Sequence, residues 1–275
     1  MTRIALFQSS TGIDPAANAL ALADAVDQAA AGGAEMLFTP EMSGLLDRNA
    51  ARAAKVLRAQ EEDQVLATVR EAAARHRVWL HIGSLAVMAD GGKVANRGFV
   101  IDREGEVRAT YDKLHLFDVD LPTGESWRES NVYSAGKGVV LVNGTPVGKL
   151  GLTICYDLRF PGLFARLAES NADVIAVPAA FTVPTGKAHW HVLLRARAIE
   201  AGLFVVAAAQ VGHHEDGRNT FGHSLVVDPW GDVLLDMGEE KGVSFAEIDL
   251  KRISDVRSRI PALTHRRPIP DPVIL

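Results

Sequence analysis

The stretch GLTICYDLRF, residues 151–160, contains the only cysteine of the 275-residue chain, and its pattern decides how the fold is interpreted. Apolar residues 147–154 predict a strand that ends at Cys155, and the segment FPG at 160–162 predicts the start of a helix. A cysteine after an apolar strand is more often an inert core residue than a reactive one. Here, however, polar residues follow it, and a turn from strand to helix lets a nucleophile stand clear of the backbone. The helix N-terminus would also favour the thiolate.

Strand-like and helix-like patterns alternate along the whole chain on both sides of this turn. We expect strands over residues 3–8, 35–40, 78–85, 98–102, 106–112, 139–142, 147–154, 174–180, 204–211, 223–228, 232–236 and 244–249. We expect helices from Pro15 to the Gly32-Gly33 pair, over 48–76, 160–171 and 189–202, and near 249–260. Long apolar strands are typical of sheets covered on both faces, and hairpin-like ones of antiparallel pairing. These patterns favour an α/β fold with one mixed sheet or two sheets, and with helices outside.

The composition is that of an ordinary globular chain. It is 48% hydrophobic and 23% charged, and its net charge of −5 gives no reason to expect nucleic acid or an anionic membrane as a partner. No apolar stretch approaches the roughly eighteen residues of a membrane helix, and the N-terminal run lacks the charged region and cleavage site of a signal peptide. A single cysteine fits a reducing compartment, so we expect a cytoplasmic protein.

The domain organisation follows from the same even composition. No repeat, linker or change of composition divides residues 1–275, so we expect one domain. Prolines at positions 268, 270 and 272 predict that residues 265–275 form an extended C-terminal arm rather than a helix.

Two charged residues are candidates to serve a cysteine nucleophile, which needs a base and a group that stabilises the oxyanion of the tetrahedral intermediate. Glu41 directly follows the strand predicted over 35–40, and Lys113 directly follows the one over 106–112. Taken alone, each is more often a solvated residue at the start of a loop. Together with Cys155 they place a carboxylate, an ammonium and a thiol at the ends of three strands, where α/β sheets collect their ligands.

Histidines are the rival bases, and metals or nucleotide cofactors are the rival chemistry. His189 and His191 lie two residues apart on a predicted helix and so point to different faces, which makes them a poor bidentate metal site. The chain has no second cysteine and no His-Glu-x-x-His motif, so we expect no zinc or other metal. Neither a P-loop nor a Gly-x-Gly-x-x-Gly motif occurs, so we expect no organic cofactor.

Three signatures, in order along the chain, resemble those of the nitrilase superfamily of carbon–nitrogen hydrolases, which use a Glu-Lys-Cys triad. They are Pro40-Glu41, the run DKLHLFD at 112–118 and the run GLTICYDLRFP at 151–161. The resemblance covers nearly the whole chain. Downstream, the segments at 186–210 and 221–233 are similar to the branch that holds ω-amidases and deaminated glutathione amidase, and are more similar to the latter.

The resemblance implies a four-layer α-β-β-α sandwich with mixed sheets, paired into a homodimer or a higher homo-oligomer. It implies Glu41 as general base, Lys113 at the oxyanion, Cys155 as nucleophile and Glu129 as a second glutamate near the triad. The backbone N–H of Tyr156 is then the other oxyanion donor. The implied reaction is the hydrolysis of a small amide through a cysteine thioester, which releases ammonia or an amine without a metal or cofactor.

Four further residues bear on the choice of substrate. Arg159 lies four residues past the cysteine, where its guanidinium could clamp a substrate carboxylate or pair with Asp157. Relatives in this branch act on small amides that also carry a carboxylate, which favours the clamp. Phe181, Thr185 and Gly186 are expected to line the same pocket.

Several interpretations stay open on the sequence alone. The favoured one is an amidase like deaminated glutathione amidase, followed by an ω-amidase that acts on α-keto acid amides. A nitrilase, an N-carbamoyl amino acid hydrolase and a catalytically silent interaction module on the same fold are the remaining alternatives. Trp190, Arg195 and Arg197 are expected to be packing and helix-surface residues.

Overall fold

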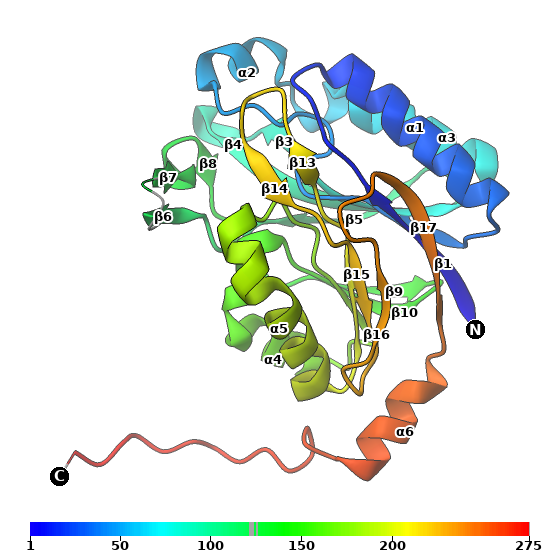
Figure 1. The fold of residues 1–275 in the computed structure, drawn as a ribbon, viewed down its shortest axis with the longest axis vertical. Coiled ribbons are helices and arrows are strands. Elements are labelled where there is room, and N and C mark those ends of the chain that lie inside the picture. Colours follow the sequence, from blue (N-terminus) through cyan, green and yellow to red (C-terminus); the bar gives the residue numbers. More distant parts are fainter. Residues whose placement is uncertain (121–123, 125, 275) are drawn as a thin grey trace.

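Two stacked β-sheets organise the computed structural model, which describes residues 1–120, 124 and 126–274 (Figure 1). In the first sheet the order is β17-β1-β2-β3-β4-β5, with the short β8 paired to β4. The bounds are β1 Thr2–Gln8, β2 Met36–Phe38, β3 Trp79–Met88, β4 Val94–Ile101, β5 Val107–Asp112, β8 Tyr133–Ser134 and β17 Gly242–Ile248. The sheet is mixed, because β1, β2 and β3 run parallel while β17, β4 and β5 join by antiparallel pairing.

The second sheet has the order β16-β15-β12-β11-β10-β9. The bounds are β9 Leu141–Thr145, β10 Gly148–Leu152, β11 Val174–Ala176, β12 Phe204–Ala207, β15 Leu225–Val227 and β16 Val233–Asp236. It is also mixed, since β10, β11 and β12 run parallel and the outer strands antiparallel. One apolar core connects the two sheets, because Met36 and Phe38 of β2 belong to the same cluster of buried side chains as residues of β10, β11 and β12.

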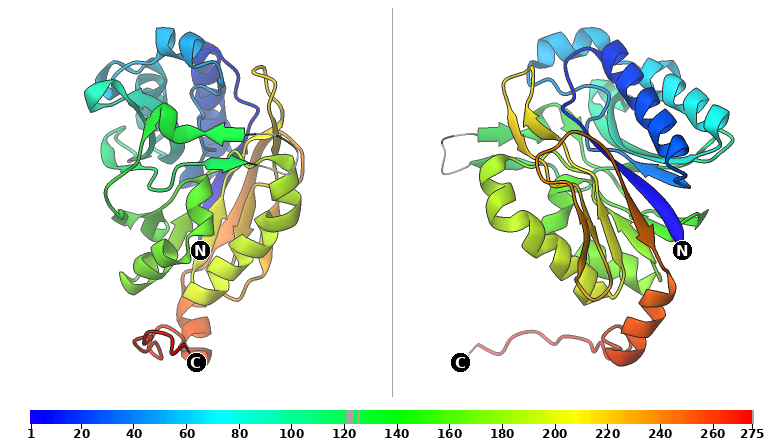
Figure 2. Two further views of the ribbon diagram at one scale, coloured as in Figure 1. Left: turned by 90° about the vertical axis from the view of Figure 1, so that its left-hand side faces the viewer. Right: turned by 45° about the vertical axis from the view of Figure 1, so that its right-hand side comes forward.

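Helices cover the outer face of each sheet (Figures 1 and 2). On the first sheet lie α1 Pro15–Ala31 and α3 Gln64–His76, and on the second lie α4 Pro161–Glu169 and α5 Val183–Ala201. Side chains alternate along β1 accordingly: Ile4 and Leu6 pack between the sheets, whereas Ala5 packs under the helices. The expected four-layer α-β-β-α sandwich with mixed sheets is therefore confirmed.

Two helix predictions differ from the structure. The segment 48–76 contains two helices, α2 Ala50–Val56 and α3, because Asp63 caps α3 by accepting a hydrogen bond from the Leu66 N–H at 2.8 Å. The intervening chain instead runs beside β3. Helix α5 begins at Val183 rather than at residue 189, and a proline in its first turn suits that start.

The smaller elements lie at the rims of the sheets. Two short hairpins are formed by β6 Asp118–Asp120 with β7 Ser126–Arg128, and by β13 Val211–His213 with β14 Asn219–Phe221. Single 3-10 turns are η1 Gln60–Glu62, η2 Asp90–Gly92, η3 Glu129–Asn131 and η4 Cys155–Arg159.

Helix α6 Lys251–Arg259 ends the folded part, and residues 266–274 then run away from it as an exposed segment without helix or strand (Figure 1). The last residue of the arm expected over 265–275 lies outside the described residues. Among the described residues, no helix is both long enough and apolar enough to cross a membrane.

Candidate active site

Cys155 lies where β10 gives way to the 3-10 turn η4, as the sequence pattern predicts. Its φ of 50° is left-handed, and a residue other than glycine usually adopts that conformation at a cost of about 1–3 kcal/mol. The Cys155 N–H donates to the carbonyl of Pro178, which follows β11, at 2.8 Å. The turn that carries the thiol is therefore tied directly to a neighbouring strand of the same sheet.

Asp157 holds this turn from inside. Its side chain is fully buried and accepts hydrogen bonds from the Ile154 N–H at 2.9 Å and the Tyr111 hydroxyl at 2.7 Å. It also accepts from the His115 N–H at 3.0 Å and contacts the His115 Nδ1 at 2.7 Å. Its oxygens are thus engaged, and the pairing of Arg159 with Asp157 is wrong: the described contacts of Arg159 lie elsewhere.

Arg197 holds the turn from the other side and is a packing residue, as Trp190 is. It is 5% exposed, and its Nε and Nη2 donate to the Leu158 carbonyl at 3.2 and 2.9 Å. The guanidinium also lies over the Phe164 ring. The face of α5 that carries Arg197 therefore packs against the nucleophile turn, and the side chain stabilises that turn.

A buried charged cluster lies beside the thiol. The Nζ of Lys113 donates to Glu41 Oε1 at 2.9 Å and to Glu129 Oε2 at 2.9 Å. Asn96 bridges the same two carboxylates through its Nδ2, at 3.0 Å to Glu41 and 3.1 Å to Glu129. Lys113, Glu41 and Asn96 are all less than 5% exposed. The ammonium thus lies between two carboxylates.

Backbone donors fix both carboxylates. The Ala180 N–H donates to Glu41 Oε2 at 2.9 Å, and the Phe117 N–H donates to Glu129 Oε2 at 2.6 Å. Glu41 follows β2 and Glu129 begins η3, so the cluster joins the ends of both sheets to the loop after β7.

The Glu41 carboxylate and the Cys155 thiol line the same cavity and influence each other electrostatically, and this sets the protonation state of the pair. Burial raises the pKa of the thiol far above its usual range, and the charge of Glu41 raises it further, while Lys113 opposes both. For Glu41, burial alone would raise the pKa, but the charge of Lys113 together with the hydrogen bonds from Cys155, Lys113 and Asn96 outweighs burial and holds the pKa below its usual value. The resting state is therefore a neutral thiol beside an ionised carboxylate.

Lys113 keeps its charge in this setting. Burial by itself would lower the pKa of the ammonium, but the carboxylates of Glu129 and Glu41 hold it well above the usual range. The cluster accordingly carries two negative charges and one positive charge next to an uncharged thiol.

The cluster lies at one side of a cavity of about 880 Å³. The Cys155, Tyr156, Arg159, Phe181 and Thr185 side chains all line it, as expected. Gly186 is not among the described lining residues. It is buried in the first turns of α5 under the Phe221 ring, because α5 starts earlier than predicted.

Arg159 lies on the cavity wall. Its Nη1 is 3.2 Å from the His189 Nδ1, and its guanidinium lies over the Phe181 ring at 5.4 Å. Among the described residues, the cavity arginines Arg159 and Arg48 make no ion pair, whereas Arg218 and Arg128 are bound to Asp216 and Asp120. A guanidinium held by stacking in this way is suited to accept a carboxylate from outside.

Asn96 is the residue in the cluster that sequence reasoning missed. The strand was predicted to start at residue 98, but β4 begins at Val94 and places Asn96 beneath the carboxylates. Its Oδ1 is buried and accepts no hydrogen bond from the described residues. A polar residue inside an apolar strand was the available signal, since such a side chain needs a partner.

Comparisons with known proteins agree with this arrangement. Residues 3–258 match the carbon-nitrogen hydrolase family model. The chain is 40% identical over 238 residues to a deaminated glutathione amidase of Yersinia enterocolitica, which covers 86% of this chain and 82% of that protein. The crystal structure of the C. elegans NitFhit protein superposes with a TM-score of 0.89 at 38% identity, over 97% of this chain and 65% of that one.

A further solved structure bears on the thiol. It is a glutamate-to-glutamine mutant of the amidase from Nesterenkonia sp. AN1 with acrylamide added at its active-site cysteine. It superposes with a TM-score of 0.78 at 27% identity and covers 95% of this chain and 98% of that one.

Proposed function

The chain belongs to the carbon–nitrogen hydrolase family, and from that premise we propose that it is an amidase for a small amide that carries a carboxylate. The observation that carries the proposal is the buried ion pair of Glu41 with Lys113, which lines the same cavity as the only thiol of the chain, Cys155. The deaminated glutathione amidases at about 40% identity support the choice of substrate class.

The first step forms a thioester. Glu41 takes the proton of Cys155 while the sulfur attacks the amide carbon, so the thiolate forms as the substrate binds. The carbonyl oxygen becomes an oxyanion, which the Lys113 ammonium and the Tyr156 N–H stabilise. Removal of one such donor typically slows an enzyme by about a hundred- to a thousandfold. Glu41 then passes the proton to the leaving nitrogen, and ammonia or an amine departs.

The second step releases the acid. Glu41 accepts a proton from water, and the resulting hydroxide attacks the thioester carbon. The tetrahedral intermediate collapses, the sulfur leaves, and the proton returns from Glu41 to Cys155. Glu129 acts as a positioning residue, because its carboxylate binds Lys113 and the Phe117 N–H and so keeps the ammonium aimed at the oxyanion.

Arg159 provides the specificity for carboxylated amides. Its guanidinium faces the cavity between Phe181 and His189 without an ion pair among the described residues, and a bidentate contact to a carboxylate would satisfy it. The cavity of about 880 Å³ leaves room for a substrate longer than a simple amide.

A substrate panel tests the proposal. Ammonia release is measured with deaminated glutathione, α-ketoglutaramate, an N-carbamoyl amino acid and a simple nitrile, with Cys155→Ala as control. We expect the carboxylated amides to react and the Cys155→Ala protein to be inactive. Activity on the nitrile or the carbamoyl compound alone would refute the substrate class. Activity on none of the four would favour a silent interaction module.

The Arg159 contact is tested separately. Arg159→Ala should raise KM for carboxylated amides and leave neutral amides nearly unchanged, whereas Arg159→Lys should recover part of the loss. An equal loss on neutral amides would show that Arg159 supports the fold of the pocket instead.

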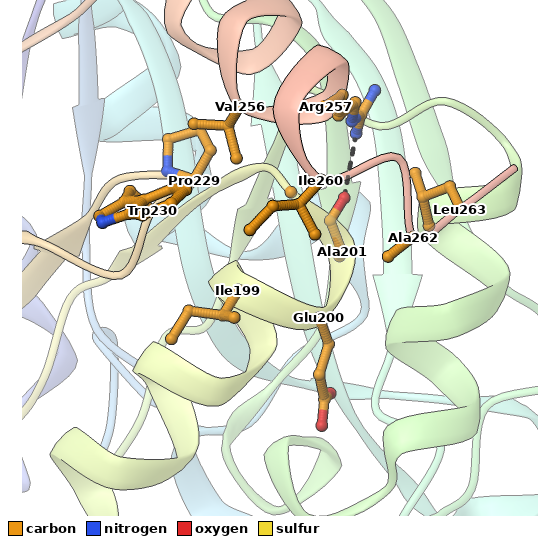
Figure 3. A pocket seen from close by; sticks show the side chains of 11 residues that line it. Ile199, Glu200, Ala201, Pro229, Trp230, Val256, Arg257, Ile260, Ala262 and Leu263 are labelled. Atoms are coloured by element: carbon orange, nitrogen blue, oxygen red, sulfur yellow. Dashed lines mark hydrogen bonds between the residues drawn. The ribbon is translucent and has the colours of Figure 1, made fainter. Parts of the chain in front are cut away.

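We also propose that two copies of the chain pair through the α5, β16 and α6 face. Large apolar side chains gather there in an exposed state: Val192, Ile199, Trp230, Val233, Leu234 and Ile260. Figure 3 shows an apolar cavity of about 140 Å³ on this face, between the end of α5, the Pro229-Trp230 turn and α6. A patch of this kind on a monomer marks an interaction site.

Light scattering after gel filtration tests the pairing. Val192→Asp with Leu234→Asp should halve the particle mass, whereas Val139→Asp, also an exposed apolar position but in the segment before β9 at the opposite edge of the sheet, should leave it unchanged. A monomeric wild type would refute the proposal.

The compartment we propose is the cytoplasm, because a catalytic thiol must stay reduced, and cell fractionation would check it.

A further inference from the structure

His191, His223 and Asp236 come from three separate elements and meet at the surface. His191 lies in α5, His223 lies between β14 and β15, and Asp236 ends β16. One ligand atom from each lies within 4.8 Å of the other two. We propose that these three side chains bind a divalent transition metal ion of the zinc class, which ties α5 to the β15–β16 hairpin.

The contacts already converge on the carboxylate. His191 Nε2 lies 2.9 Å from Asp236 Oδ2, and His223 Nδ1 lies 2.9 Å from Oδ1 and 3.2 Å from Oδ2. In a tetrahedral zinc site with bonds of about 2.0–2.2 Å, the ligand atoms are about 3.3–3.5 Å apart. The carboxylate would therefore recede by about half an ångström and the two imidazoles would approach each other, which small side-chain rotations allow.

Supporting contacts hold two of the three ligands in place. The Gly238 N–H donates to Asp236 Oδ1 at 2.9 Å. His223 has a φ of 56°, its N–H donates to the Gly238 carbonyl at 2.7 Å, and its carbonyl accepts from Trp190 Nε1 at 2.8 Å. The Phe221 ring stacks on the His223 ring with centroids 4.4 Å apart. Contacts that orient ligands in this manner are a regular part of metal sites.

The donor set indicates the class of ion. Two imidazole nitrogens with one carboxylate oxygen suit zinc and its neighbours rather than calcium or magnesium, which prefer oxygen ligands. The three side chains are between 24% and 35% exposed, so an ion can enter and water can fill the fourth position. The sequence alone pairs His191 only with His189 on the same helix. The fold instead brings His223 and Asp236, which are distant in sequence, next to His191.

The three side chains lie close to the cavity, so a bound ion would affect the cavity wall. Phe221 stacks on His223 and also covers Gly186 in α5, and the preceding Thr220 lines the cavity. A metal bound at His191, His223 and Asp236 would therefore stiffen one wall of the cavity. This inference does not depend on the proposed amidase activity.

Calorimetric titration with Zn²⁺ tests the proposal. It uses untagged, chelator-treated Cys155→Ala protein at pH 7.5, so that the active-site thiol cannot bind the metal. We expect one Zn²⁺ per chain and, with Co²⁺ as a second probe, visible absorption bands of a tetrahedral complex. His191→Gln, His223→Asn and Asp236→Asn should each weaken binding at least about tenfold, since even supporting residues contribute that much.

His189→Gln is the matched control, because it removes an imidazole from the same helix without touching the cluster. It should bind Zn²⁺ like the parent. Zn²⁺ should also raise the unfolding temperature of the parent but not of His191→Gln, whose folding is checked by circular dichroism. The absence of saturable binding, or binding that survives all three ligand substitutions, would overturn the proposal and leave a metal-free hydrogen-bonded cluster.

Discussion

Replacement of Glu41 by glutamine should abolish turnover and yet make the thiol more reactive. In the wild type, burial and the charge of Glu41 raise the pKa of Cys155, while the charge of Lys113 and a smaller contribution from the Ala180 backbone lower it. Glu41→Gln keeps the shape of the side chain but removes the opposing charge. Lys113 then favours the thiolate with less opposition, so the thiolate fraction at neutral pH must rise. The base that turnover needs is lost by the same change.

The size of both effects follows from the geometry. Two unit charges about 4 Å apart interact by about 4 kcal/mol at an effective dielectric constant of about 20, and about 1.4 kcal/mol is enough for a tenfold change. We therefore expect alkylation of Cys155 by iodoacetamide at pH 7 to accelerate at least about tenfold. Loss of a general base typically costs about 10²- to 10⁴-fold in rate, so kcat/KM should fall by that factor.

The assay must separate a reactive thiol from an unfolded one. Glutamine offers one acceptor oxygen where Glu41 accepts from Lys113, Asn96 and the Ala180 N–H, which should cost about 1–3 kcal/mol of stability. Alkylation is therefore measured well below the melting temperature, which is checked by circular dichroism. Mass spectrometry locates the adduct on the only cysteine.

Glu129→Gln is the matched control. It makes the same change on the far side of Lys113, where Glu129 contacts Asn96 and the Phe117 N–H. Its alkylation rate should stay near that of the wild type. If the folded Glu41→Gln protein reacted no faster than wild type, the charge of Glu41 would not govern the thiol, and the assignment of Glu41 as base would be refuted.

Three further changes test other parts of the structure. Asn96→Leu removes the amide that donates to both carboxylates, so kcat/KM for ammonia release should fall about tenfold or more; an unchanged value would contradict the role. Burial lowers the pKa of His81 from 6.5 to about 3, so the unfolded chain alone binds the proton between these values and stability falls as the pH drops below 6.5. Between pH 6.5 and 5, the free energy of unfolding measured with urea should fall by about 2 kcal/mol in the wild type but not in His81→Leu. The same dependence of this free energy on pH in both proteins would contradict the prediction. In Gly186→Ala the new Cβ would lie 2.2 Å from Phe221, so unfolding should become easier by about 1–3 kcal/mol, whereas Gly162→Ala, which meets open space, should be neutral.

The triad positions could be predicted because each depends on local sequence. Lys113 directly follows β5, and Glu41 and Cys155 each come three residues after the last residue of β2 and β10; the carboxyl ends of strands in a layered α/β fold gather at one edge. The signatures around them supplied the roles. Nothing in that pattern required knowledge of which helix packs against which strand.

The supporting residues could not be predicted in this way. Arg197 looks like a surface arginine on α5, and only the packing of α5 against η4 brings it to the Leu158 carbonyl. Asn96 lies inside β4, where its side chain meets carboxylates from β2 and η3 that are distant in sequence. The prediction of a single helix over 48–76 was wrong for a related reason. The helical period is continuous in the sequence, but a new helix begins after the cap at Asp63.

The charge balance of the cluster explains why these buried ions can support catalysis. Proton transfer from Cys155 to Glu41 moves one negative charge from oxygen to sulfur without changing the total, so no additional charge is buried during the step. Lys113 contacts Glu41 before the transfer and attracts the thiolate after it. Glu129 keeps the ammonium charged and in place throughout, which a single carboxylate could not do once Glu41 is protonated. In the proposed mechanism the second glutamate therefore acts through its charge and need not touch the substrate.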